Sequence, residues 1–281
     1  MMSHRHKYHQ VAVNENEFKL AVSYLSRPSD DIIVFIHELG CSSDTFISAW
    51  ESKALAEHSL LAFDLPGFGL SQGPSRYSYQ LKEQSRICLA LLSQFPAKRI
   101  HIVGHGMGGA IGLVLTRSLT PASFVSVEGN LIAADCKLIS RTAYAMSEST
   151  FVDAGFAQLQ QSLSAYPRHC FDLINASPTA LHRSAKSLVE WSDIGLLFDL
   201  FVSLSVPKVY IHGERNAGLT VLQRLDGLVE SKQIRDSAHF PMIDNADAFY
   251  ATVAEFIKRT RPESHLGLRA FALETSSTPL F

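Results

Sequence analysis

The sequence predicts an α/β fold, in which a mainly parallel, twisted sheet is flanked by helices and carries a helical cap insertion. Short apolar runs typical of strands recur along the chain, and from residue 32 onward they alternate with segments of helical period. Between residues 130 and 205 clear strand signals stop. Alternation of this kind is typical of parallel sheets with helices on both faces. The 281 residues are 46% hydrophobic and 19% charged, which is enough to bury a sizeable core.

The first two apolar runs, 11–13 and 18–25, are separated by a turn-like Asn-Glu-Asn-Glu sequence. We expect these two runs to form an antiparallel hairpin at the edge of the sheet. The later strand-like runs are 32–36, 60–65, 99–103, 123–127 and 208–213, and helical periodicity covers 79–95 and 107–119.

The segment 130–205 is rich in helix formers and aromatic residues. We interpret it as a helical cap over the carboxyl edge of the sheet, and we expect residues 246–259 to form a closing helix. The predicted division is therefore a core made of 1–129 and 206–281, with 130–205 as the inserted cap.

Composition and charge exclude several functional classes. The net charge of −2 gives no reason to expect nucleic acid as a partner. The longest apolar stretch, 187–206, is interrupted by Glu190, Asp193 and Asp199, so we expect no membrane span, and the N-terminus lacks the apolar region of a secretory signal. The four cysteines lie far apart, without the spacing of a disulfide framework or a zinc site, at positions 41, 88, 136 and 170. We expect a cytoplasmic protein without metal or cofactor.

The glycine cluster in residues 99–113 fits two incompatible patterns. Gly104, Gly106 and Gly109 match the dinucleotide-binding fingerprint, and Glu128 lies near the position of its ribose-binding acid. Gly104, Gly106 and Gly108 match instead the nucleophile elbow of hydrolases, except that glycine replaces the serine. Gly108 favours the elbow, because the fingerprint does not need it and the tight elbow turn does.

Three further motifs occur in order around the elbow: "FIHELG" at 35–40, "FDLPGFGLS" at 63–71 and "SAHFPMIDN" at 237–245. With the elbow they resemble the α/β-hydrolase fold family over nearly the whole chain. The resemblance implies a capped hydrolase of a carboxylic ester or related acyl bond, acting through serine, histidine and an acid. It implies a small apolar ester-like substrate and no cofactor; the oligomeric state stays open.

The resemblance also assigns roles to residues. His239 is the expected base, and Asn216 stands where most members of the family carry the acid, so we expect Glu128 to be the acid, with Glu214 as second choice. An amide can accept a hydrogen bond, but it lacks the charge that stabilises an imidazolium.

The expected oxyanion donors are the backbone N–H groups of Leu39 and Met107. Glu38 stands where the family usually has glycine, and its charge would disfavour an oxyanion unless its side chain points away.

Glycine at position 106 removes the nucleophile, and a comparable deletion lowers turnover by roughly 10⁶-fold. The chain is therefore expected to be inactive or strongly impaired as a serine hydrolase. The alternatives are a small-molecule-binding homologue, a hydrolase that activates water at the vacant hydroxyl position, and a dinucleotide-binding protein that uses Gly104, Gly106 and Gly109.

Overall fold

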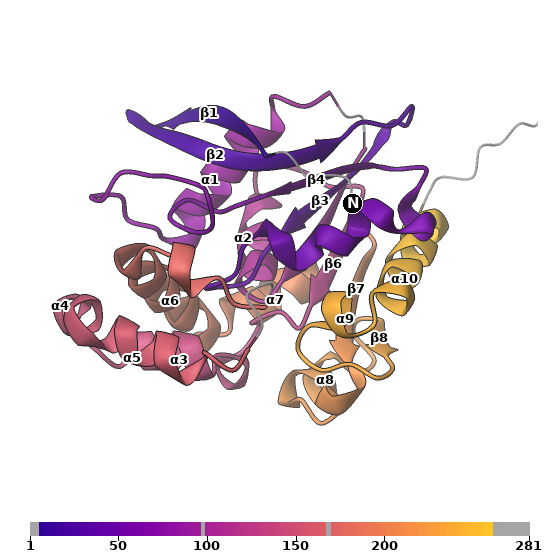
Figure 1. Cartoon of the computed structure of the whole chain (residues 1–281). Coiled ribbons are helices and arrows are strands. Elements are labelled where there is room, and N and C mark those ends of the chain that lie inside the picture. Colours follow the sequence, from indigo (N-terminus) through magenta and orange to yellow (C-terminus); the bar gives the residue numbers. More distant parts are fainter. Residues whose placement is uncertain (1–5, 97–98, 167–169, 261–281) are drawn as a thin grey trace, which may run out of the picture.

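An eight-stranded, mostly parallel sheet forms the centre of the molecule in a computed structural model, which describes residues 6–96, 99–166 and 170–260 (Figure 1). The strands follow the order β1-β2-β4-β3-β5-β6-β7-β8. Their bounds are Lys7–Val13 (β1), Asn16–Leu25 (β2), Asp31–Ile36 (β3), Ser59–Phe63 (β4), Arg99–His105 (β5), Ser123–Val127 (β6), Lys208–Gly213 (β7) and Ser231–Ile234 (β8). Strand β2 pairs antiparallel with β1 and β4, and the pairs from β4 to β8 are parallel. The predicted fold class and the edge hairpin are both confirmed.

The central strands are buried along their whole length, which explains their continuous apolar sequences. Every residue of β3, β4 and β6 is buried. Along β3, Ile32 and Val34 belong to one hydrophobic core, whereas Ile33 and Phe35 belong to a second one. Since side chains alternate across a strand, the two cores lie on opposite faces of the sheet.

The α-helices divide between these two faces. Helices α1 and α2, with the inserted helices, contribute to the first core, and α10 packs in the second. The α-helical bounds are Leu81–Leu92 (α1), Met107–Leu115 (α2), Leu138–Tyr144 (α3), Glu148–Thr150 (α4), Phe156–Ser162 (α5), Pro178–Asp193 (α6), Leu196–Ser203 (α7), Thr220–Leu225 (α8), Pro241–Asp244 (α9) and Ala246–Arg259 (α10). The shorter helical segments are Ser43–Glu51 (η1), Lys53–Leu55 (η2), Ala133–Asp135 (η3), Phe151–Gly155 (η4), Leu173–Asn175 (η5) and Glu214–Asn216 (η6). Helix α10 has the predicted bounds of the closing helix.

Helices α3 to α7 all lie between β6 and β7, in the segment expected to be a cap (Figure 1). The longest of them, α6, begins with Ser177, whose side chain accepts a hydrogen bond from the N–H of Ala180, and with Pro178 in its first turn. It joins the core through Ser184, whose hydroxyl accepts a hydrogen bond from Gln84 of α1 at 3.0 Å. Of the predicted division of the chain, residues 1–5, 97–98, 167–169 and 261–281 lie outside the described residues.

The edge strand β8 is not among the strands that the sequence predicts. Its sequence, Ser-Lys-Gln-Ile, is polar, and of its residues Ile234 alone is buried. A strand that pairs on one side and faces solvent elsewhere needs no apolar run, so the sequence of β8 carries no strand signal.

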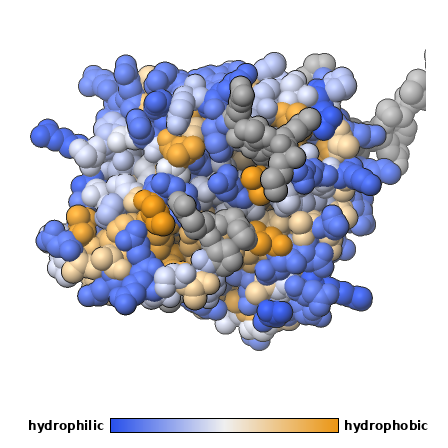
Figure 2. All heavy atoms as spheres, in the orientation of Figure 1, coloured by the Kyte–Doolittle hydropathy of each residue, from blue (hydrophilic) through white to orange (hydrophobic). Residues whose placement is uncertain are grey.

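The face of the molecule shown in Figure 2 is largely hydrophilic, with apolar side chains gathered in small groups. Within the part of the chain that the structure describes, no helix has the length and apolar character needed to cross a membrane.

Candidate active site

Gly106 occupies the sharp turn between β5 and α2. Its backbone has φ of 50° and ψ of −117°, which favours glycine, and its N–H donates to the carbonyl of Val127 at 3.0 Å. Two residues later, a Cβ on Gly108 would overlap the carbonyl oxygen of Ile36 in β3. The turn therefore has the tight geometry expected of a nucleophile elbow.

The side chain of Glu38 fills the space above this turn. One carboxylate oxygen, Oε1, accepts the N–H of Leu39 at 2.7 Å, and the other, Oε2, accepts the N–H of Met107 at 3.0 Å. A Cβ built on Gly106 would overlap the same carboxylate. The Glu38 side chain therefore points inward and accepts both of the N–H groups that the sequence predicts as oxyanion donors.

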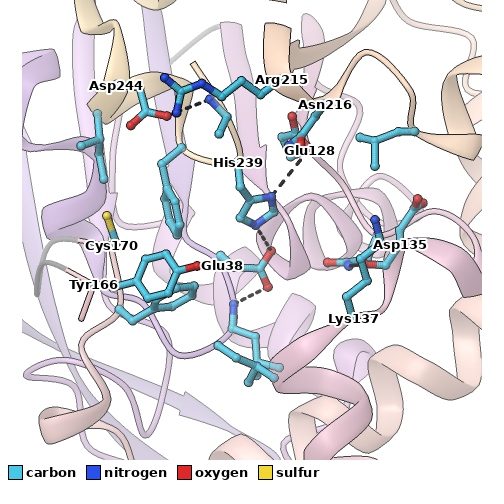
Figure 3. A pocket seen from close by; sticks show the side chains of 18 of the residues that line it. Glu38, Glu128, Asp135, Lys137, Tyr166, Cys170, Arg215, Asn216, His239 and Asp244 are labelled. Carbon is cyan, nitrogen blue, oxygen red and sulfur yellow. Dashed lines mark hydrogen bonds and ion pairs between the residues drawn. The ribbon is translucent and has the colours of Figure 1, made fainter. Parts of the chain in front are cut away.

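His239 lies in the loop between β8 and α9, between two carboxylates (Figure 3). Its Nδ1 is 3.6 Å from Oε2 of Glu128, and its Nε2 is 3.9 Å from Oε2 of Glu38. Both distances lie within ion-pair range but exceed ordinary hydrogen-bond lengths. The structure thus brings together His239, Glu128, Glu38 and the turn at Gly106.

Glu128 follows β6 directly and is 5% exposed. Its backbone is in the left-handed region, with φ of 47°, an unfavourable conformation for a residue with a side chain. The carboxylate oxygen Oε1 accepts the N–H of Gly213 at 2.8 Å, which aims Oε2 at the imidazole of His239. The two other candidates at this edge differ: Glu214 accepts the N–H of Asp236 at 2.9 Å, and Asn216 lines the pocket.

Two carboxylates and burial act on the charge state of His239. Burial disfavours the charged imidazole, but Glu128 and Glu38 outweigh burial and raise the pKa of His239 above its usual value. For Glu38, burial is the largest influence and raises the pKa of the carboxyl, although His239 and the two amide N–H groups oppose it. The two carboxylates therefore favour the charged form of His239, whereas burial favours the neutral form of Glu38.

Three neighbouring residues of the motifs support the loops through hydrogen bonds. The imidazole of His37 bonds to the carbonyl of Glu38 at 2.8 Å and accepts the N–H of Leu65 at 2.9 Å. The carboxylate of Asp64 accepts the N–H of Ser43 at 2.8 Å, and His105 is buried and bonds through Nε2 to the carbonyl of His239 at 2.8 Å.

A pocket of about 560 Å³ opens above Glu38 and His239 (Figure 3). Its apolar and aromatic walls include Ile139, Tyr166, Phe171, Leu219, Phe240 and Ile243, and its charged groups are Glu38, Glu128, Asp135, Lys137, Arg215, His239 and Asp244. The lining comes from both the insertion and the carboxyl ends of the strands, the place where ligands bind in open α/β sheets. Gly106 is not among the lining residues, because Glu38 covers it.

The geometry can be compared with the needs of two bound groups, a metal ion and the pyrophosphate of a dinucleotide. Glu38, His105 and His239 offer metal-ligating atoms within 4.8 Å of one another, but Glu38 already accepts two amide hydrogen bonds and His105 Nε2 is engaged with a carbonyl. A pyrophosphate at the N-terminus of α2 would meet the Glu38 carboxylate on the Met107 amide, so the geometry argues against the dinucleotide alternative.

The inward direction of Glu38 is what the sequence analysis missed. The sequence signal is the departure from glycine at Glu38 in "HELG", which by itself predicts only an electrostatic effect on an oxyanion. Its combination with glycine at position 106 could have indicated that one side chain fills the space left by the other.

Comparisons with known proteins agree with this architecture. A family model described as "Alpha/beta hydrolase family" matches residues 33–252. Among curated proteins, the chain is 33% identical over 85 residues to the bovine (Bos taurus) mesoderm-specific transcript homolog protein, covering 30% of this chain and 25% of that protein. It is 23% identical over 139 residues to a putative esterase/lipase 2 of Mycoplasma pneumoniae, covering 50% of this chain and 49% of that protein. The chain thus matches about a quarter to a half of the length of these relatives.

Solved structures share the fold at low sequence identity. An N-acyl homoserine lactonase complexed with N-butanoyl homoserine superposes with a TM-score of 0.72 at 16% identity, covering 92% of this chain and 99% of that one. A thermophilic esterase from Thermogutta terrifontis gives a TM-score of 0.69 at 15% identity, covering 91% and 100%. With the family match across most of its length, and with its sheet, elbow and loop motifs in the matching order, this chain belongs to the α/β-hydrolase family.

Proposed function

We propose that this chain binds a small, largely apolar ester-like molecule in the pocket and does not hydrolyse esters by serine-type acyl transfer. The observation that carries the proposal is the Glu38 carboxylate, which occupies both the nucleophile position above Gly106 and the two oxyanion amides. The family's esterase and lipase relatives and the apolar walls of the pocket support an ester-like ligand.

Serine acyl transfer needs a hydroxyl within reach of the base and a free pair of N–H groups for the oxyanion. Gly106 lacks the hydroxyl, and Glu38 takes the N–H pair. Restoring the serine alone is therefore insufficient for ester hydrolysis, because the serine Cβ would collide with the Glu38 carboxylate. The displaced carboxylate would also remain close to His239.

The test compares four proteins on p-nitrophenyl butyrate and hexanoate: the wild type, Gly106→Ser, Glu38→Gly and the double variant. We expect turnover from the double variant alone, at least about 10³-fold above the other three, since loss of a nucleophile costs roughly 10⁶-fold in turnover. Adding His239→Ala to the double variant should abolish the gain.

Two results would contradict the proposal. One is His239-dependent ester turnover by the wild type at the rate of the double variant. The other is full activity in Gly106→Ser with Glu38 in place. The binding half is checked by calorimetry with butyl butyrate: the wild type should bind it without turnover, and Ile139→Trp, which fills the apolar wall, should weaken binding at least tenfold.

A further inference from the structure

The pocket has two chemically different sides, and Figure 3 shows Tyr166 to one side of the His239 imidazole and Asp135 to the other. On the aromatic side, Tyr166 packs edge-on against Phe171 with ring centroids 5.3 Å apart, and Phe171 packs in the same way against Phe240 at 5.2 Å. Such a wall suits an alkyl chain or a ring of the ligand. The opposite side, formed by residues 130–135, presents polar groups and is called the polar side below.

Two hydrogen-bond acceptors on the polar side have no donor among the described residues. Asn130 is 6% exposed and lines the pocket, and its Oδ1 is buried without a partner. Its Nδ2 donates to the backbone carbonyl of Asp135 at 3.0 Å, which determines the orientation of the amide. Oδ2 of Asp135 accepts the N–H groups of Leu131 and Ile132, both at 3.0 Å, whereas Oδ1 accepts none from the described residues. Since a buried acceptor without a donor is unfavourable, this pair indicates a ligand that supplies the donors.

The charges of the pocket indicate which kind of donor fits. Its charged lining includes four carboxylates, the permanent cations Lys137 and Arg215, and His239. Burial raises the pKa of Asp135 to about 6, although the backbone N–H groups and Lys137 oppose it. Near neutral pH the Asp135 carboxylate is therefore charged in an environment that disfavours its charge, so a positively charged donor would stabilise it. A hydroxyl offers one hydrogen and no charge, whereas a primary ammonium offers three hydrogens and a positive charge.

We propose that the ligand of this pocket carries a primary ammonium group, which donates hydrogen bonds to Oδ1 of Asp135 and Oδ1 of Asn130 while its apolar part packs on the aromatic side. The inference rests on the proposed function, because it names the polar end of the small, largely apolar molecule that the pocket binds. Asp135 and Asn130 are then specificity-determining residues. Both lie outside the four motifs that the chain shares with its family.

The first measurement compares three probes on the unaltered protein by calorimetry near neutral pH: hexylammonium, hexyltrimethylammonium and 1-hexanol. All three carry the hexyl chain, but hexyltrimethylammonium has the charge without N–H donors, and 1-hexanol has a donor without the charge. We expect hexylammonium to bind at least about tenfold more tightly than either of the others, because hydrogen bonds between charged groups are the stronger ones. A smaller preference over either probe would overturn the proposal.

The second measurement locates the ammonium with two variants of opposite expected effect. Asp135→Asn removes the negative charge and should weaken the binding of hexylammonium at least about tenfold. Lys137→Met removes a positive charge that acts on Asp135, so it should strengthen that binding by about two- to tenfold. Neither variant should change the affinity for butyl butyrate by more than about twofold, because this ester has no donor. Asp153→Asn, at an exposed position of the insertion, is the matched control and should change no affinity by more than about twofold.

The other buried carboxylates that line the pocket are Glu38 and Glu128, and each could attract a cation. If Glu38→Gln or Glu128→Gln weakens the binding of hexylammonium more than Asp135→Asn does, the cation lies elsewhere and the proposal is wrong. Weaker binding in Lys137→Met would contradict it as well. If Asp135→Asn does not fold, the three probes on the unaltered protein and the Lys137→Met variant still decide.

Failure of this inference and failure of the proposed function are distinguishable. If the unaltered protein binds butyl butyrate without turnover but does not prefer hexylammonium, this inference alone is wrong. If the unaltered protein hydrolyses p-nitrophenyl butyrate, the proposed function is wrong, and the ranking of the three probes still tests the ammonium subsite.

Discussion

Glu128 and Glu214 are both glutamates near the carboxyl end of the sheet, but they face different partners. The carboxylate of Glu128 is oriented by the Gly213 N–H and faces His239, whereas that of Glu214 accepts the N–H of Asp236. Orientation of the imidazole therefore depends on Glu128 in this geometry.

In the Glu38→Gly/Gly106→Ser background, we expect Glu128→Gln to lower kcat for p-nitrophenyl butyrate by about 10²- to 10⁴-fold, because an amide leaves the imidazolium without its counter-charge. Glu214→Gln is the matched control and should change kcat less than twofold. The reverse pattern in the two rates would transfer the role of the acid to Glu214.

Residue positions were more predictable than side-chain directions. The motif around His239 and the end of β6 at Glu128 place both residues at one edge of the sheet, and the structure brings them together as expected. The direction of Glu38 depends on a rotamer that is favoured only when position 106 lacks a Cβ and two amides lie in reach. No pattern within a single motif contains that information.

At the scale of elements, the contact between α2 and β3 sets the position of the elbow. Gly108, in the first turn of α2, lies against the backbone carbonyls of Ile36 and His37, which cannot rotate away as a side chain could. Gly104 in β5 lies similarly close to Gly109, since a Cβ on it would be 2.5 Å from the Gly109 Cα. Glycine at these positions allows helix and strand to approach closely.

We expect Gly108→Ala to lower the free energy of unfolding by about 2–4 kcal/mol, because overpacking here must separate two backbone segments. Gly218→Ala is the matched control, since nothing lies within 4 Å of its built Cβ, and it should change stability by less than about 1 kcal/mol. Urea unfolding followed by circular dichroism measures both, and equal stability of the two variants would refute the packing argument.

Elements with a strong apolar pattern were predicted well. Strands β3 to β7 are buried over most of their length and have apolar sequences. The closing helix α10 has an amphipathic sequence with buried Phe249, Val253 and Phe256. Strand β8 and the 3₁₀ helix η1 were not predicted. Both depend on pairing and packing with distant parts of the chain more than on a local periodicity of apolar residues.

At the scale of the whole molecule, a buried ionic network ties three strands together at the edge opposite the pocket. Asp31 at the start of β3 is 1% exposed and accepts hydrogen bonds from Arg99 at 2.5 and 2.8 Å. His101 bonds to Asp31 at 3.1 Å and to Ser123 of β6 at 2.8 Å. Burial alone would raise the pKa of Asp31, but Arg99 and His101 outweigh it and lower that pKa to about 2.

The lowered pKa of Asp31 predicts how stability responds to acid. Because the folded state holds this proton less tightly than the unfolded chain, the stabilisation is complete above about pH 4 and is lost as the pH falls through about 2. The wild type should be more stable than Asp31→Asn at pH 5, and the difference should shrink by about 2 kcal/mol at pH 2. Urea unfolding across this range measures it.

Asp153→Asn, at an exposed position of the insertion, provides the control and should keep a constant difference from the wild type. A constant difference for Asp31→Asn as well would show that the network does not link folding to protonation of Asp31.

The order of the motifs made the overall architecture predictable, because each motif follows a strand of a parallel sheet and such strands end at one edge. The motif loops therefore meet at that edge whatever their side chains are. Strand order does not determine which side chain fills the space between these loops, because packing in the site depends on all of the loops at once.

The mutual exclusion of a side chain at position 106 and an inward carboxylate at position 38 makes these two positions a linked pair. A chain that regained serine first, or lost the glutamate first, would pass through a form with neither arrangement intact. Among relatives we therefore expect Gly106 to be inherited together with Glu38, and serine at the elbow together with a small residue in the loop. A survey of these two columns in related chains would separate the two lineages without an assay.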